Sequence, residues 1–127
     1  MRVRVGVIAF LLLCGAAYSE DGHFKAEYWS AVGIASGTAG VDLVTSQQLY
    51  ARHPWCIEVG SPWLYGSKPG AVREGLTMAA GTGILALSGY WMHRSRYRWI
   101  RRIWAVPMAV VSEEHLRAGI HNTGACR

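Results

Sequence analysis

The stretch from Gly75 to Met92, GLTMAAGTGILALSGYWM, decides the fold of this chain, because none of its 18 residues is charged. Charged or titratable residues flank it on both sides. At a rise of about 1.5 Å per residue, an uncharged helix of this length is typical of a bilayer crossing. We therefore expect a membrane helix over residues 75–92.

The composition of the whole chain agrees with lipid contact. Its 127 residues leave room for one domain, which excludes a multidomain enzyme. Charged residues make up 17% of the chain, below the roughly 25% of ordinary soluble domains. A small helical membrane protein fits these numbers best.

A second candidate helix covers residues 28–50, where Asp42 is the single charged side chain in 23 residues. Serine, threonine and glutamine residues make its second half polar, so that half is expected to face protein. It contains Gly33-x-x-x-Gly37, and the helix over 75–92 has Gly75, Ala79 and Gly83 at the same spacing. Such patterns favour close helix packing or self-association in lipid.

The third candidate helix covers residues 103–122. Spacings that alternate between three and four residues place six side chains on one face of this helix, which we expect to point inward. They are Trp104, Met108, Val111, His115, Ala118 and Asn122. Pro107 is expected to kink this helix or to mark a late start. The predicted fold class is therefore all-α, as a helical hairpin or a three-helix bundle.

The N-terminus has the layout of a secretory signal peptide over residues 1–19, with Arg2 and Arg4 ahead of an apolar run. An uncleaved anchor helix is the alternative. Residues 20–127 then form a single helical domain, which we expect in the inner membrane of a bacterial envelope. Export would leave Cys56 and Cys126 as a pair that either forms a disulfide or stays as two thiols.

The segment over residues 93–102, HRSRYRWIRR, is strongly basic through Arg94, Arg96, Arg98, Arg101 and Arg102. The positive-inside rule places it in the cytoplasm, whereas an exported N-terminus and two crossings place it outside, so the topology stays open. Interleaved Tyr97 and Trp99 would also suit nucleic acid, but a basic run beside an apolar helix is more typical of contact with anionic lipid headgroups. We predict lipid contact and no nucleic-acid binding.

Asp42 is the most informative single residue, because an acid within a membrane helix is a functional candidate by default. The alternative is that it caps the following loop through backbone N–H groups. Glu58, His115 and His121 could meet it, since carboxylates and imidazoles together bind metals or transfer protons. The opposing interpretation is that His121 and Asn122 bond to loop backbone.

The sequence contains no complete motif for zinc binding, phosphate binding or nucleophilic catalysis. His53-x-x-Cys56 is at best half of a zinc site, and no phosphate-binding glycine loop, nucleophile elbow or H-E-x-x-H motif occurs. We therefore expect no catalytic residue, no bound metal and no cofactor.

The motifs V41-D-L-V-T-S46, C56-I-E58, S61-P-W-L-Y-G66 and I120-H-N122 carry a resemblance over roughly residues 28–122. The chain resembles a group of small bacterial multi-span membrane proteins of unknown function, with an acid-plus-hydroxyl helix, a Glu-x-Asn-Pro loop and a terminal His-Asn. It departs from that pattern at Gly60-Ser61-Pro62. The resemblance implies no reaction and marks Asp42, Thr45, Glu58, Pro62, His121 and Asn122.

The leading functional hypothesis is a non-enzymatic integral membrane protein with a structural or accessory role. It would contact lipid, and it would dock to a protein partner or to itself through its small-residue helix faces. One alternative is a cation-binding or proton-relay protein that uses Asp42, Glu58 and His121. The other is an exported soluble helical domain.

Overall fold

Helices α2 (Asp21–Arg52) and α6 (Val106–Asn122) pack against each other through one stripe of side chains on each helix. The structure is a computed structural model that describes residues 21–57 and 62–125. The α2 stripe recurs every three or four residues and is buried at Ala31, Ala35, Ala39, Asp42, Ser46 and Leu49. The facing stripe on α6 has the same period and is buried at Met108, Ser112 and Gly119. Small residues on both sides let the two helices approach closely.

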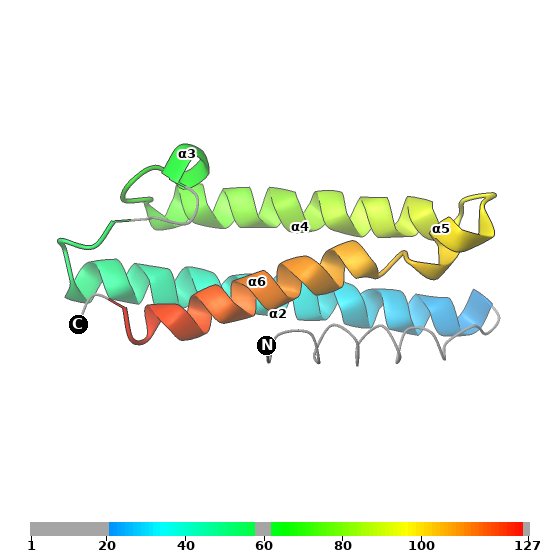
Figure 1. Ribbon diagram of the computed structural model, residues 1–127, viewed down its shortest axis with the longest axis horizontal. Helices are drawn as coiled ribbons and strands as arrows, with labels where there is room; N and C mark the ends of the chain where they lie inside the picture. Colours follow the sequence, from blue (N-terminus) through cyan, green and yellow to red (C-terminus); the bar gives the residue numbers. More distant parts are fainter. Residues whose placement is uncertain (1–20, 58–61, 126–127) are drawn as a thin grey trace.

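Helix α4 (Ala71–His93) runs antiparallel to α2 and α6, which run in the same direction (Figure 1). Two short helices lie near its ends, α3 (Pro62–Tyr65) over its start and α5 (Arg98–Arg102) after its end. The described residues contain helices and no strand. The all-α prediction is confirmed, and the long helices form a three-helix bundle.

The predicted helix bounds need correction. The first helix begins at Asp21 and not at 28, because Phe24 and Tyr28 still pack inward on Trp104. The third begins at Val106 and not at 103, because proline fits the first turn of a helix, where its missing N–H costs nothing. Pro107 therefore marks the late start that was one of its two predicted roles.

The second helix begins at Ala71, four residues before the predicted Gly75, and ends at His93. Its first turn carries Glu74, which is buried against α2 and so belongs to the packed helix.

Within the described part of the chain, no helix combines the length and the apolar character that a membrane crossing requires.

Close approaches of the helices occur at glycines other than those of the predicted Gly33-x-x-x-Gly37 motif. A Cβ added at Gly33 or Gly37 would meet nothing within 4 Å. A Cβ on Gly119 would lie 3.1 Å from Val41 Cγ1, and one on Gly89 would lie 3.2 Å from the carbonyl oxygen of Trp104. The closest approaches at glycine therefore occur at Gly89 and Gly119, and Gly33 and Gly37 lie on the exposed surface.

An aromatic cluster fills the bundle where α2 begins and α4 ends. Phe24 stacks on His93 with 3.4 Å between ring centroids and meets Trp104 edge-on at 5.2 Å. Tyr28 lies 6.1 Å from both Trp104 and Tyr90, and its hydroxyl donates to the Ala86 carbonyl at 3.0 Å. Large rings thus replace the small and polar side chains that pack the other half of the bundle.

Candidate functional site

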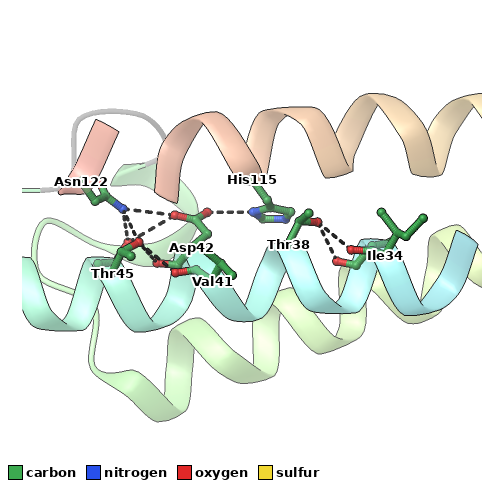
Figure 2. A network of polar contacts seen from close by, with 9 residues as sticks. Ile34, Thr38, Val41, Asp42, Thr45, His115 and Asn122 are labelled. Carbon is green, nitrogen blue, oxygen red and sulfur yellow. Dashed lines mark hydrogen bonds and ion pairs between the residues drawn. The ribbon is translucent and has the colours of Figure 1, made fainter. Parts of the chain in front are cut away.

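Asp42 lies at the centre of a polar network between α2 and α6 (Figure 2). Its side chain is 10% exposed, so most of its hydrogen bonds must come from protein groups. His115 Nδ1 lies 2.8 Å from Asp42 Oδ2, and Asn122 Nδ2 donates to Oδ1 at 3.2 Å. Two side chains of α6 therefore converge on one acid of α2.

Ser46 completes the buried network one turn further along α2. Its hydroxyl lies 3.4 Å from Asp42 Oδ1 and accepts a hydrogen bond of 2.8 Å from Asn122 Nδ2. The register follows from helical spacing, since residues four apart on α2 and seven apart on α6 each lie on one face. Asp42 and Ser46 therefore form one row, and His115 and Asn122 form the row that faces it.

Thr45 lies at the edge of this network. Its hydroxyl donates to the carbonyl oxygens of Val41 and Asp42 at 2.9 and 3.0 Å, and Asn122 Nδ2 approaches it at 3.5 Å. Thr38 bonds back to its own helix in the same way, through Ile34 and Ala35 (Figure 2). These threonines satisfy themselves within α2, and the contact of Thr45 with α6 is weak at that distance.

The structure separates His121 from the residues grouped with it by sequence. Its side chain is exposed, and of the two histidines predicted to meet Asp42 it is His115 that lies beside the carboxylate. Adjacent residues on a helix point about 100° apart, so Asn122 and His121 cannot both face α2. Glu58 lies outside the described residues.

Cys56 is buried and disulfide-bonded. Cys126, its predicted partner, lies outside the described residues. A disulfide removes the thiolate that a metal would need, so the half zinc site at His53-x-x-Cys56 loses its sulfur ligand. Among the described residues, no group of three or more His, Cys, Asp and Glu is arranged to hold a metal ion.

A second polar contact joins α2 to α4 and was not predicted. Glu74 is 2% exposed, and its Oε2 accepts a hydrogen bond of 2.6 Å from Gln47 Nε2. The same Gln47 amide donates to the Pro69 carbonyl at 3.1 Å. The sequence places Glu74 in the charged flank of the uncharged stretch, and no local pattern indicates that it is buried.

The donors around Asp42 limit what this network can do chemically. An ionised carboxylate offers about four acceptor positions, and contacts from His115, Asn122 and Ser46 occupy three of them. A cation would have to displace these donors to reach the oxygens. The arrangement therefore favours a structural role, in which hydrogen bonds hold α2 against α6. Proton exchange between Asp42 and His115 is the chemistry that remains accessible to it.

Comparison with known proteins does not assign this chain to a family. No protein-family model, no curated protein and no solved structure matches the chain. The resemblance to small multi-span membrane proteins accordingly stays a hypothesis based on short motifs.

Proposed function

We propose that this chain is an accessory membrane protein of the bacterial envelope, which associates with lipid and with a protein partner through the outer faces of its helices. The observation that carries the proposal is the exposure of large apolar side chains along α4. Val72, Leu76 and Trp91 are 76%, 68% and 74% exposed. Apolar surface of this extent is typical of a face that another molecule or a membrane covers.

The interior of the bundle supports the same proposal by contrast. Its buried positions hold Asp42, Ser46, Glu74 and Ser112 together with several alanines, and Met108 is the largest fully buried side chain among the described residues. A water-soluble domain of this size normally buries its large apolar side chains. In the half of the bundle around Asp42, small and polar residues point inward, whereas tryptophan, leucine and isoleucine side chains of the three long helices are exposed.

The disulfide at Cys56 supports the proposed export, because disulfides persist in oxidising compartments such as the periplasm. It agrees with the predicted signal peptide over residues 1–19, a segment that lies outside the described residues. An envelope location would bring the apolar faces of the bundle to a membrane.

The test compares two lysine substitutions in the full chain carrying a C-terminal tag. Leu87, on α4, is 61% exposed, and Gln48, on α2, is also exposed. If the face of α4 lies in lipid, Leu87→Lys should cost roughly 2.5 to 3.5 kcal/mol and lower the yield in carbonate-washed membranes, whereas Gln48→Lys should not. Release of the wild-type protein into the soluble fraction would contradict the proposal.

Proton exchange is a second candidate function, favoured by the 2.8 Å contact between His115 Nδ1 and Asp42 Oδ2. Proteoliposomes that hold the full chain and a pH-sensitive dye would test it. Proton flux that disappears in both Asp42→Asn and His115→Gln but persists in His121→Gln would support this function. No flux above that of empty vesicles would remove it.

A further inference from the structure

One end of the bundle gathers the net positive charge of the chain. The segment 91–103, which we call the arginine corner, holds five arginines and no aspartate or glutamate. Since the formal net charge of the whole chain is +5, the residues outside this corner are neutral on balance. The corner covers the end of α4 and all of α5, at the opposite end of α4 from α3 (Figure 1).

Three acidic side chains of the described residues have partners away from the corner. Asp42 pairs with His115, and Glu113 forms an ion pair of 3.0 Å with Arg117. Glu74 accepts its hydrogen bond from Gln47. These three acids are therefore engaged away from the corner, whose own segment supplies no carboxylate.

Aromatic rings support two of the guanidinium groups. Arg94 lies over the Tyr90 ring at 4.6 Å from its centroid. Arg96 lies over the Tyr97 ring at 4.9 Å and donates to the Tyr97 hydroxyl at 2.8 Å. Such contacts hold the planar fork of arginine at the surface, and that fork matches the oxygens of a phosphate group.

Exposed tryptophans accompany these charges. Trp99 is 65% exposed and lies within the arginine run, and Trp91 precedes it on the last turns of α4. Tryptophan favours the headgroup layer of a bilayer, where its ring meets apolar chains and its N–H meets water. Phosphate-matching cations beside interfacial tryptophans are the combination that a negatively charged membrane surface requires.

We infer that the arginine corner binds the surface of a bilayer that contains anionic phospholipid. The inference rests on the membrane association proposed above and adds which lipid is bound and by which end of the bundle. Nucleic acid would use the same charges and rings, but it would gain nothing from the exposed apolar side chains of the corner, such as Ile103.

The experiment measures flotation of the full-length protein with two kinds of vesicle, phosphatidylcholine alone and phosphatidylcholine with phosphatidylglycerol. In about 0.1 M salt the partition coefficient should be on the order of a hundredfold higher with the anionic vesicles, and in about 1 M salt the excess should disappear. Binding to neither vesicle would overturn the proposed membrane association itself. Equal binding to both would overturn the lipid inference alone.

Matched variants locate the binding surface. Arg102→Gln should lower binding to anionic vesicles about fivefold, and Arg96→Gln combined with Arg102→Gln should lower it roughly 25-fold. Arg52→Gln removes the same charge at the other end of the bundle and should leave binding unchanged. An equal loss for Arg52→Gln and Arg102→Gln would show that total charge, and not the corner, attracts the protein.

Two further arms test the aromatic contribution and the competing ligand. Trp99→Ala should weaken binding to both kinds of vesicle, whereas Trp63→Ala, at a more exposed tryptophan of α3, should not. A single-stranded oligonucleotide in excess should leave anionic vesicles bound. Displacement of the vesicles by that oligonucleotide would overturn the lipid inference in favour of nucleic acid.

Discussion

The two halves of the bundle are held together by different interactions. Toward the ends of α2 and α6, Asp42 and Ser46 meet His115 and Asn122 through directional hydrogen bonds. Toward the start of α2, by contrast, aromatic rings pack face-to-face and edge-to-face. Hydrogen bonds between buried groups require one register of the helices, whereas rings tolerate small shifts. We therefore expect the polar half to select the register and the aromatic half to contribute burial.

Removing the central acid should have the largest effect. Asp42→Ala leaves the half-buried His115 without its acceptor and leaves Asn122 with Ser46 as its remaining close acceptor, and we expect the free energy of unfolding to fall by about 3 to 5 kcal/mol. Chemical unfolding followed by circular dichroism, in one detergent for all variants, measures this change. Ser36→Ala, at an exposed position of the same helix, is the control and should stay within about 0.5 kcal/mol of wild type.

The aromatic half should respond almost as strongly to loss of its central ring. Trp104→Ala removes contacts with Phe24 and Tyr28, and we expect a loss of about 3 kcal/mol in the same unfolding measurement. Trp29 is 60% exposed and touches Tyr28 edge-on, so Trp29→Ala should cost less than about 1 kcal/mol. Similar losses for both tryptophans would contradict the assignment of the cluster to the core.

Coupling between Asp42 and His115 sharpens the comparison, because a directional pair should be strongly non-additive. In a double-mutant cycle of Asp42→Ala and His115→Ala, we expect an interaction energy of about 1 to 3 kcal/mol. The corresponding cycle of Asp42→Ala and Trp104→Ala joins the two halves and should be additive within about 0.5 kcal/mol. Additivity in the first cycle would contradict a direct interaction between Asp42 and His115.

A methyl group added at a close approach should have a smaller effect. In Gly89→Ala the new Cβ would lie 2.8 Å from Met108 Cε, which can move, and 3.2 Å from the Trp104 carbonyl oxygen, which is backbone. We expect a loss of about 1 to 2 kcal/mol. Gly83→Ala, in the same helix with open space around it, should stabilise by about 0.5 to 1 kcal/mol through helix propensity. A stabilising Gly89→Ala would show that α4 and α6 are less closely packed.

The inward face of α6 was predictable from spacing only in part, because the buried Ser112 and Gly119 lie outside the predicted stripe. Alternating steps of three and four placed Met108, His115 and Asn122 on one stripe, and all three face the bundle interior. Residue chemistry grouped both His115 and His121 with Asp42, and only His115 lies beside the carboxylate. Periodicity over several turns was therefore a better guide to the site than residue type.

The contact of Gln47 with Glu74 could not be predicted in the same way. The two residues are 27 positions apart and lie on different helices, so no local pattern connects them. Glu74 also lies at the boundary of the apolar stretch, and that position gave no indication that it is buried in the first turn of α4. Burial of a charged residue depends on what packs over it, and the sequence around it does not contain that information.

The sequence by itself determined the helical class and the polar stripe of α2, because these depend on local spacing. Tertiary structure alone decided that His115 and Asn122 face Asp42, that Gln47 reaches Glu74, and that Gly89 and Gly119 make the close contacts. Helical periodicity sets which residues share a face, whereas the rotation and register of packed helices set which faces meet.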